Sequence, residues 1–320
     1  MQRWLVFGGT RFVGHHIAAA ARARGHALTL FHRGETPAHL DGPVEEILGD
    51  RDGDLHRLAG RRWDAVIDVC GYLPRLVAAA AAAVQAEHYT FISSVSVYAP
   101  RALGLPPLDE GVPVRGWDGP PTEEITEERY GPLKVDCERA VAAHFAGTKL
   151  VIRPGYVVGP GDRTQRFSWW LHRLQRPGPL LVPANAHVPL QVIDARDLAA
   201  FVVRATEARV EGAFDCVGPA RPWGAVYACA GPDTRPVAVD GAWLAAQGVD
   251  EDALPMWLPP DRLAESLIAS GARARAAGLT LRPLAETVAD ILAEPPGDLP
   301  AERLSPEREA PLLAAWEARP

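Results

Sequence analysis

The feature that most constrains the fold of this chain is an alternation of short, continuously apolar segments with segments of helical period. Strands are predicted at WLVFGG (4–9), ALTLFHRG (27–34), VEEILGD (44–50), DAVIDVCG (64–71), YTFISSVSVY (89–98) and KLVIRPGYVVGP (149–160). Helices are predicted at 12–24, in the alanine-rich stretch after 71, and at 130–145. Strands that are apolar along their whole length are typical of a parallel sheet covered on both faces. The sequence therefore predicts an α/β fold with a doubly wound, Rossmann-type parallel sheet.

The alternation stops after Pro160, and this break divides the chain. We expect a sheet domain over 1–160, to which a strand and a helix at 190–206 return. A smaller C-terminal lobe is expected over 161–189 and 207–294. The stretch 295–320 is rich in Pro, Glu and Arg, which predicts a loosely attached tail with a short helix near 312–316.

Composition and charge exclude several classes of protein. The 320 residues are 48% hydrophobic and 23% charged, which is enough apolar sequence for a large core. A formal net charge of −7 argues against a protein that binds nucleic acid through bulk electrostatics. The four cysteines are scattered without a CxxC motif, so we expect neither a disulfide framework nor a metal site. No signal-peptide pattern and no apolar run of bilayer length is present, so a cytoplasmic protein is expected.

The segment GGTRFVG (8–14) follows the first strand and opens the first helix, which is the context of a dinucleotide-binding turn. Gly8 permits the tight turn, and Gly14 lets the helix pack closely against the strand. Free N–H groups at the start of the helix would face a pyrophosphate. The candidate cofactor residues of this turn are Gly8, Gly9, Thr10, Arg11, Phe12, Val13 and Gly14.

Two arginines near the turn favour NADP over NAD as the cofactor. Arg33 follows the second strand, where an acidic residue would bind the ribose 2′-hydroxyl of NAD. A guanidinium group there suits a 2′-phosphate, and Arg11 would close over the same phosphate. The alternative is that both side chains simply reach solvent. Asp50 and Arg51 follow the third strand, and Asp50 is placed to hydrogen-bond the adenine amine or to serve as an ordinary turn residue.

Tyr130 and Lys134 of YGPLK are four residues apart, so they share one face of a helix. A phenol with an ordinary pKa near ~10 is a weak base at neutral pH. A nearby ammonium group lowers that pKa and favours the phenolate, which makes the pair a candidate acid–base group. Lys134 would also reach ribose hydroxyls.

Three serines end the strand at 89–98, at the sheet edge where α/β proteins bind ligands. We take Ser94 as the hydroxyl that orients a substrate oxygen and Ser96 as a further substrate contact, whereas Ser93 points into the sheet. The alternative is that all three only terminate the strand.

The motifs GGTRFVG, the Gly-Asp pair at 49–50, SSVSVY, YGPLK, RPGYVVGPGD and IDARDLA occur in this order. Together they resemble an extended short-chain dehydrogenase/reductase of the NAD-dependent epimerase/dehydratase superfamily, closely over 3–205 and loosely over the rest. The resemblance implies a catalytic triad of Ser94, Tyr130 and Lys134, and a C-terminal lobe that holds the substrate. It also implies that the loop after the fourth strand is Cys70–Gly71 and that the turn beside the nicotinamide is Pro154–Gly155.

Two departures from the family pattern bear on function. Arg11 stands where a third glycine is usual, as in an atypical branch that includes chloroplast RNA-associated proteins, some of which have lost the triad. Sugar-nucleotide 4,6-dehydratases carry an Asp-Glu pair directly after the catalytic hydroxyl residue, where this chain has Val95 and Ser96. Elimination of water by their mechanism is therefore not expected.

The segment DRTQRFSWWLHRL (162–174) supplies substrate candidates in the lobe. Its arginines would hold a diphosphate, and its indoles would stack on a base or a sugar. The candidates are Arg163, Arg166, Trp169 and Trp170. The alternative is that the aromatic side chains seat the lobe on the core while the arginines form a solvated face.

These observations lead us to expect an NAD(P)-dependent oxidoreductase that transfers a hydride at a secondary alcohol or ketone, with NADP favoured and NAD the alternative. A reductase and a nucleotide-sugar epimerase fit the residues equally. The second class is a non-catalytic NAD(P)-binding regulatory or RNA-associated protein, against which the intact triad counts. A small-molecule substrate is expected, a nucleotide sugar among the candidates, with no metal, nucleic acid or membrane partner. Family analogy implies a homodimer through the Tyr130 helix and its neighbour.

Overall fold

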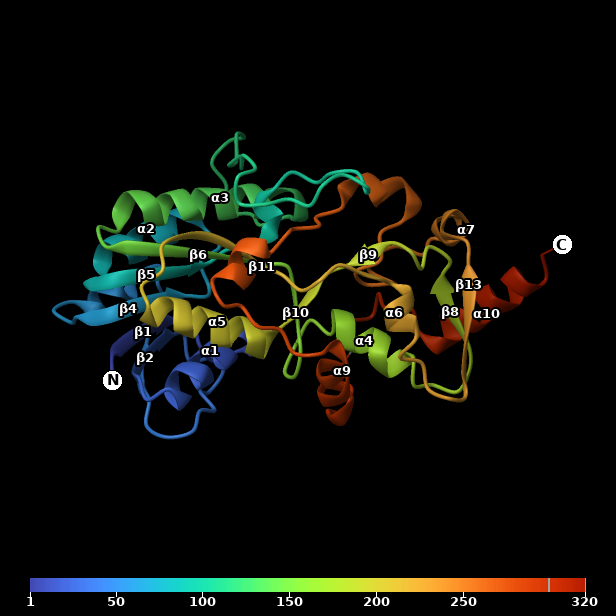
Figure 1. The fold of residues 1–320 in the computed structure, drawn as a ribbon, viewed down its shortest axis with the longest axis horizontal. Helices are drawn as coiled ribbons and strands as arrows, with labels where there is room; N and C mark the ends of the chain where they lie inside the picture. Colours follow the sequence, from blue (N-terminus) through green and yellow to red (C-terminus); the bar gives the residue numbers. More distant parts are fainter. Residues whose placement is uncertain (299, 320) are drawn as a thin grey trace.

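In a computed structural model, which describes residues 1–298 and 300–319, the chain forms a seven-stranded parallel sheet in the order β11-β6-β5-β4-β1-β2-β3 (Figure 1). The strands are β1 Arg3–Phe7, β2 Ala27–His32, β3 Glu45–Leu48, β4 Trp63–Asp68, β5 Ala86–Ile92, β6 Thr148–Pro154 and β11 Gly212–Cys216. The strand order reverses between β1 and β4, as it does in doubly wound sheets. The predicted Rossmann-type α/β fold is confirmed.

Helices cover both faces of this sheet. On one face lie α1 Phe12–Ala23 and α5 Ala195–Glu207, and on the other lie α2 Pro74–Ala83 and α3 Glu127–His144. Successive residues of β1 serve the two layers in turn, since Trp4 and Val6 pack in the first layer and Leu5 and Phe7 in the second. This double burial explains why the strands are apolar along their whole length.

The C-terminal lobe has its own core, in which Trp170, Trp223 and Trp257 are almost fully buried. Its main elements are α4 Arg166–Arg173, the parallel pair β8 Gly178–Pro183 and β13 Thr234–Val239, and α9 Leu284–Ala293. The shorter elements, in the lobe and between it and the central sheet, are β7 Tyr156–Val158, β9 Pro189–Leu190, β10 Val192–Asp194, β12 Arg221–Pro222, α6 Gly224–Tyr227, α7 Gly241–Ala246 and α8 Ala272–Ala276. Three 3₁₀ helices complete the list: η1 Asp54–Leu58, η2 Val95–Val97 and η3 Pro260–Glu265.

The expected lobe segment 207–294 is divided between the two parts of the molecule. β11 pairs in parallel with β6 and extends the central sheet, and α8 packs against β11. The sheet therefore recruits a strand from sequence that lies beyond the predicted sheet domain. The sequence carries little sign of this because GAFDC is short and follows an ordinary helix–turn pattern.

The stretch expected to be a loose tail is instead part of the lobe. It forms α10 Pro306–Glu317, whose N-terminus is capped by Ser305, and Leu304 and Leu313 are buried in the lobe core. Glu309 on this helix is also buried. Residues 299 and 320 of the predicted tail lie outside the described residues.

Two element boundaries place the predicted functional residues at the carboxyl edge of the sheet. β5 ends at Ile92, six residues before the predicted end of that strand, so the serines follow the strand and lie at or in η2. α3 begins at Glu127, and the hydroxyl of Thr126 accepts a hydrogen bond from the N–H of Arg129 at 3.3 Å. Tyr130 therefore lies in the first turn of α3.

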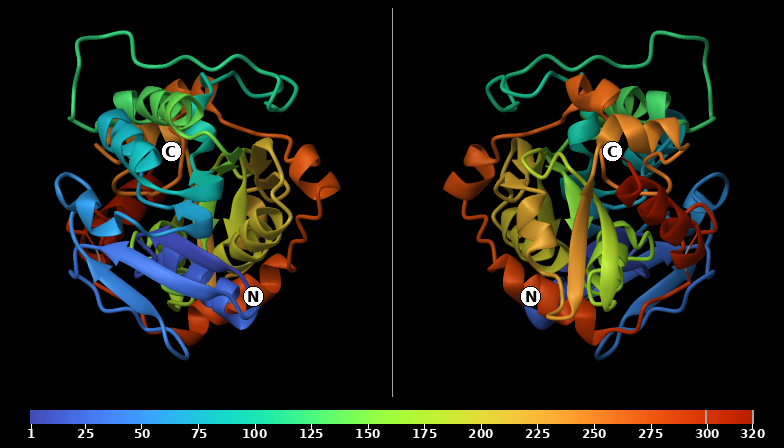
Figure 2. Two further views of the ribbon diagram at one scale, coloured as in Figure 1. Left: turned by 90° about the vertical axis from the view of Figure 1, so that its left-hand side faces the viewer. Right: turned by 90° about the vertical axis from the view of Figure 1, so that its right-hand side faces the viewer.

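The stretch 100–121, rich in proline and glycine, arches outside α2 and α3 (Figure 2). Isolated β-bridges join Arg101 to Ser266 and Leu108 to Ala269. The start of this loop is therefore tied to the segment 266–269, which forms one wall of the cavity described next.

Candidate active site

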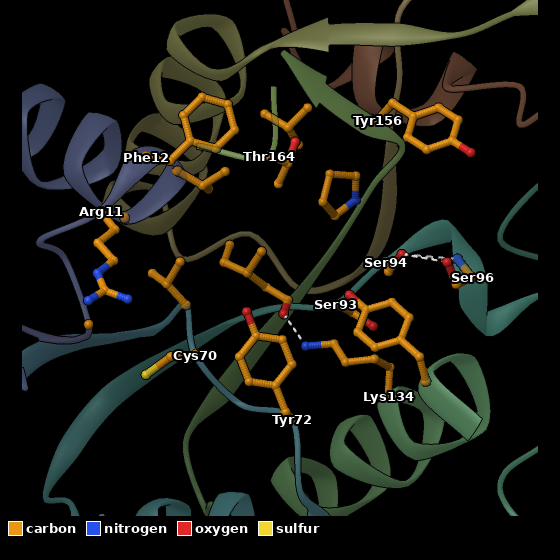
Figure 3. A pocket seen from close by; sticks show the side chains of 18 of the residues that line it. Arg11, Phe12, Cys70, Tyr72, Ser93, Ser94, Ser96, Lys134, Tyr156 and Thr164 are labelled. Atoms are coloured by element: carbon orange, nitrogen blue, oxygen red, sulfur yellow. Dashed lines mark hydrogen bonds between the residues drawn. The ribbon is translucent and has the colours of Figure 1, made fainter. Parts of the chain in front are cut away.

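A cavity of about 890 Å³ opens at the carboxyl ends of the central strands, between the sheet and the lobe (Figure 3). This volume is near the upper end of the roughly 300–1,000 Å³ that is usual for ligand pockets. Its lining includes the cofactor candidates Gly8, Gly9, Thr10, Arg11, Phe12, Val13, Gly14, Arg33, Asp50, Arg51, Cys70, Pro154 and Gly155. It also includes Ser94, Ser96, Tyr130, Lys134 and Arg166. The fold thus brings motifs that are far apart in the sequence to one cavity.

The glycine turn has the backbone that its sequence predicts. Gly8 and Gly9 have φ angles of +92° and +93°, a region that strains any residue with a Cβ atom. A Cβ on Gly14 would lie 2.8 Å from the backbone nitrogen of Gly9, so only glycine allows this approach of α1 to the turn. The backbone of a dinucleotide-binding turn is therefore present at Gly8, Gly9 and Gly14.

Arg11 replaces the usual glycine without backbone strain. It occupies the N-cap position of α1 with φ −130°, an extended conformation that any residue adopts. No side chain caps the helix, and its first turn contains no acidic residue. The first N–H groups of α1 and the positive end of its dipole are therefore available to an anion.

Arg11 and Arg33 converge on one carboxylate, that of Glu35. Arg33 contacts Glu35 at 2.9 Å and Arg11 contacts its other oxygen at 3.2 Å, while the Nε of Arg11 donates to Thr36 at 2.7 Å. All three charged side chains are about half exposed (48–60%). The two guanidinium groups are thus close enough to share a single anionic group. Sequence reasoning missed Glu35, although it stands only two residues after Arg33.

Arg51 does not project into the cavity as a free side chain. Its guanidinium group forms two bonds with Asp68, at 2.8 and 3.2 Å, and lies 4.9 Å from the ring centre of Phe7. Only 9% of the Arg51 side chain is exposed, so it forms part of the cavity floor and fixes the end of β4. Asp50 is exposed at the rim, where its carboxylate accepts the N–H of Asp52 at 2.8 Å in a turn.

Tyr130 and Ser94 face each other across the contact between α3 and η2. The N–H of Ser96 donates to the Ser94 hydroxyl at 3.1 Å, and the two serine hydroxyls are 3.0 Å apart (Figure 3). A Cβ on Gly131 would lie 1.9 Å from the Ser96 carbonyl oxygen, so the glycine of YGPLK permits this close approach. Burial raises the pKa of the Tyr130 phenol, while a hydrogen bond with Ser94 and the charge of Arg166 oppose the rise.

Lys134 is almost completely buried, with 2% exposure, and its amino group is held by backbone carbonyls. Nζ donates to the oxygens of Gly71 and Ile92, each at 2.7 Å, and lies 4.4 Å from the ring centre of Phe91 (Figure 3). Burial lowers the pKa of Lys134 to about 8. Two of its three N–H donors are therefore committed to the backbone, and one remains for a ligand. Gly71, a predicted cofactor residue, does not line the cavity itself, but its carbonyl oxygen helps to hold Lys134 in place.

Ser93 also lines the cavity, but its hydroxyl is engaged in a buried polar network. Its hydroxyl donates to Glu138 at 2.5 Å, and Glu138 pairs with Arg153 through two bonds of 2.7 and 3.0 Å. Arg153 also donates to the hydroxyl of Tyr98 at 2.9 Å. Because the network joins α3 to the ends of β5 and β6, it holds the strand end that presents Ser94.

Three of the predicted substrate contacts do not line the cavity. Trp169 and Trp170 are 4% and 0% exposed and pack in the lobe core, and Arg163 lies on the exposed surface. For Trp169 and Trp170 the alternative is therefore correct: the two indoles serve packing of the lobe and do not contact a ligand in the cavity. Arg166 does line the cavity, with its guanidinium carbon 5.1 Å from the ring centre of Tyr156. Arg166 is the first residue of α4, and both buried tryptophans lie one turn further along the helix.

Sequence reasoning missed several lining side chains. Tyr72 is 46% exposed, and its ring centre lies 6.5 Å from that of Tyr130 and 5.4 Å from Nζ of Lys134. Figure 3 places Tyr72 between the Arg11 end and the Ser94 end of the cavity. Its position directly after Cys70–Gly71 is a signal that could have found it. Tyr156 directly follows the predicted Pro154–Gly155 turn, whereas the lobe contributes Met256, Leu258, Leu267 and Ile268, for which the sequence carries no motif.

Comparison with known sequences gives distant relatives. No family model matches the chain. The chloroplast stem-loop binding protein of 41 kDa b of Arabidopsis thaliana is 26% identical over 212 residues, which are 61% of this chain and 52% of that protein. The epimerase family protein SDR39U1 of Bos taurus is 28% identical over 237 residues, or 68% of this chain and 75% of the relative. The match thus spans about half the length of the chloroplast protein.

Comparison with solved structures gives the fold over nearly the whole chain. A putative epimerase from Burkholderia cenocepacia J2315 superposes with a TM-score of 0.66 at 20% identity, covering 91% of this chain and 97% of that one. Human SDR39U1, solved with NADPH, gives 0.63 at 20% identity and covers 92% and 100%. The UDP-N-acetylglucosamine 4-epimerase of Bacillus cereus gives 0.61 at 15% identity and covers 91% and 98%. The chain therefore shares its fold with these epimerase structures, which is the fold that the motif resemblance implied.

Neither a membrane-spanning helix nor a metal-binding cluster occurs in the described part of the chain. Within residues 1–298 and 300–319, no helix combines the length and the apolar character required to cross a bilayer. The same residues contain no group of three or more His, Cys, Asp or Glu side chains arranged to hold a metal ion.

Proposed function

We propose that this protein is an NAD(P)-dependent oxidoreductase that acts on a secondary alcohol or ketone, with NADP(H) as the favoured cofactor. The observation that carries the proposal is the shared cavity, which Ser94, Tyr130 and Lys134 line together with the glycine turn at the uncapped start of α1. Acid–base side chains and an anion cradle in one cavity are what hydride transfer to a carbonyl requires.

The residues present fit a dinucleotide. The backbone of the glycine turn and the free N–H groups of α1 would hold the pyrophosphate, in a cradle that a Cβ at Gly14 would close. Arg11 and Arg33 would hold a 2′-phosphate, and the third N–H of Lys134 would reach a ribose hydroxyl. The loop at Pro154–Gly155 would border the nicotinamide. When bound, the nicotinamide supplies or accepts the hydride at the carbon that carries the oxygen.

The protein's own groups handle the proton. Burial keeps the Tyr130 phenol protonated, so in the reducing direction it gives its proton to the carbonyl oxygen as that oxygen gains charge. Ser94 donates a hydrogen bond to the same oxygen while its own oxygen is held by the N–H of Ser96. The positive charge of Arg166 stabilises the phenolate that remains.

Substitution of Tyr130 by Phe tests the proposal. Tyr130→Phe should lower turnover by about 10²- to 10⁴-fold, the usual contribution of a positioned proton donor, while affinity for NADPH stays within about twofold. Activity is followed by NADPH oxidation with a panel of aliphatic and aromatic ketones, and affinity by fluorescence titration. Tyr72→Phe is the matched control, because it removes a hydroxyl from the same cavity without touching the proposed proton donor. Equal turnover of Tyr130→Phe and wild type, or failure of either nicotinamide cofactor to bind, would contradict the proposal.

A second candidate function is a non-catalytic, RNA-associated role, which the likeness to the chloroplast stem-loop binding protein favours. The formal net charge of −7 and the presence of all three triad residues weigh against it. A gel-shift titration with RNA hairpins discriminates the two. A regulator would bind RNA equally as wild type and as Tyr130→Phe, whereas an oxidoreductase should show no specific shift with either protein.

A further inference from the structure

The end of the cavity beyond the triad differs from what a nucleotide sugar requires. The lobe lines it with Met256, Leu258, Leu267 and Ile268, to which β9 adds Pro189 and Leu190, and the neutral polar side chains beside them are Gln191 and Ser266. A wall of this kind buries hydrocarbon and offers few hydrogen bonds to a sugar. The wall is also firmly placed, because the side chain of Gln191 bonds to the N–H and the carbonyl of Ala269, at 2.9 and 2.8 Å.

Arg166 is the positive group of this part of the lining. Among residues 1–298 and 300–319 its guanidinium group forms no ion pair; Nε donates to the Thr164 hydroxyl at 3.3 Å, and the guanidinium plane lies over Tyr156. A guanidinium group that lines a cavity without a carboxylate partner is suited to bind an anionic group of a ligand. Its charge also acts on the Tyr130 phenol, which places that anion near the reacting atoms.

The charge around Arg166 suits a single negative charge. Asp162 lines the same region, where its carboxylate accepts the N–H and the hydroxyl of Thr164 at 2.9 and 2.8 Å. Glu265, the other acidic group of the lobe-side lining, is paired with Arg262. Arg303 lies behind Arg166 but does not line the cavity, and burial lowers its pKa. Because Arg262 is shared with Glu127 and Glu251, Arg166 is the one guanidinium group of this wall that can offset an added negative charge, and the several charges of a nucleoside diphosphate exceed it.

The groups expected to recognise a nucleotide are also absent from this region. Trp169 and Trp170 are buried in the lobe core, and Arg163 lies outside the cavity. The exposed aromatic ring of Tyr156 is already covered by Arg166. Among the described residues, the lobe side chains that line the cavity include no second guanidinium group that could bind a diphosphate. They also offer no uncovered aromatic face on which a base could stack.

We propose that the substrate is a compact, largely apolar hydroxy acid or oxo acid. Its carboxylate binds Arg166, its hydrocarbon body lies against Met256, Leu258, Leu267 and Ile268, and its reacting carbon–oxygen group meets Tyr130 and Ser94. This inference rests on the proposed function, and it favours a reductase or dehydrogenase over a nucleotide-sugar epimerase.

Equilibrium binding tests the inference without requiring turnover. Protein saturated with NADP⁺ is titrated by calorimetry with phenylacetate, hydrocinnamate and phenylbutyrate, with the uncharged amide of each, and with UDP. A charge-assisted hydrogen bond makes the best carboxylate at least about tenfold tighter than its amide. The preference should fall to less than about threefold in Arg166→Gln. Arg163→Gln is the matched control on the same segment and should retain it, and UDP should bind more weakly than the best carboxylate.

Three results would overturn the inference: UDP binding more tightly than every carboxylate, binding by none of the carboxylates, or an undiminished carboxylate preference in Arg166→Gln. A protein that fails to saturate with NADP⁺ would instead overturn the proposed function, and this inference with it. Normal saturation followed by any of the three results leaves the proposed function standing and removes only the substrate class.

Discussion

The buried carboxylate of Glu309 should be essential for the stability of the lobe. It lies on α10 with 4% exposure and accepts hydrogen bonds from the N–H of Leu181 at 2.7 Å, from Arg176 at 2.8 Å, and from Arg173. Arg173 is 3% exposed, and its guanidinium carbon lies 5.0 and 5.2 Å from the rings of Trp169 and Trp170. The C-terminal helix is thus joined to the lobe core by a buried ion pair.

The expected loss follows from this arrangement. Glu309→Gln keeps an acceptor for the Leu181 N–H but removes the charge that balances Arg173. Burial already lowers the pKa of Arg173 to about 10, and its Nε and one terminal nitrogen have no hydrogen-bond partner. A buried cation that loses its counter-ion costs about 3–5 kcal/mol, so we expect the free energy of unfolding to fall by that amount.

Urea unfolding followed by tryptophan fluorescence measures the loss by linear extrapolation. Glu317→Gln is the control on the same helix, because Glu317 is exposed and its contact with Arg235 spans 3.3 Å; its effect should stay within about 0.5 kcal/mol. The double variant Arg173→Met with Glu309→Gln removes the unbalanced charge and places a thioether between the indoles. It should recover more than half of the loss.

Two results would refute this reasoning. One is a loss below about 1 kcal/mol in Glu309→Gln, which would mean that Arg173 needs no counter-ion. The other is a double variant no more stable than the single one, which would mean that packing of α10, and not charge, accounts for the loss.

Three further predictions concern the cavity. Arg33→Asp should shift the ratio of NADPH to NADH affinity toward NADH by tenfold or more in fluorescence titrations, and an unchanged ratio would contradict the phosphate assignment. Gly131→Ala places a Cβ against the Ser96 carbonyl, so it should lower both the Tm and turnover, whereas Gly53→Ala, which meets no atom within 4 Å, should lower neither. The pKa of Lys134 is about 8 in the folded state against its ordinary 10.5, so below pH ~8 the folded protein carries a buried charge that destabilises it. The free energy of unfolding of wild type, measured by denaturant titration, should therefore rise by about 3 kcal/mol relative to that of Lys134→Met between pH ~8 and ~10.5. A difference that does not change with pH would contradict the burial of this charge.

Much of the fold was predictable because the signals are local. A strand buried on both faces is apolar over most of its length, and Trp4–Phe7 of β1 and Ala65–Ile67 of β4 follow that rule. The spacing of Tyr130 and Lys134 places both on one side of any helix, and the glycines of 8–14 mark a turn that other residues cannot form. Those residues line the cavity because the carboxyl ends of parallel strands share one edge of the sheet.

Other assignments were beyond local reasoning because burial depends on distant partners. The composition of 295–320 is that of a mobile tail, yet Glu309 meets Arg173 from another element and the helix becomes part of the core. Trp169 and Trp170 could face a ligand or a core equally well, and only the position of α4 against the lobe decides this. The pairing of Arg11 and Arg33 through Glu35 likewise requires two loops to meet in space.

The sequence by itself determined most strands and helices of 1–160 and the class of sheet they form, and it marked Ser94, Tyr130 and Lys134 as candidates, because hydrophobic period and residue spacing act within one element. Only the tertiary structure decided which side chains face the cavity, because that depends on how separate elements pack. It placed Arg166 and several apolar side chains of the lobe in the cavity lining, and it placed Trp169 and Trp170 in the lobe core.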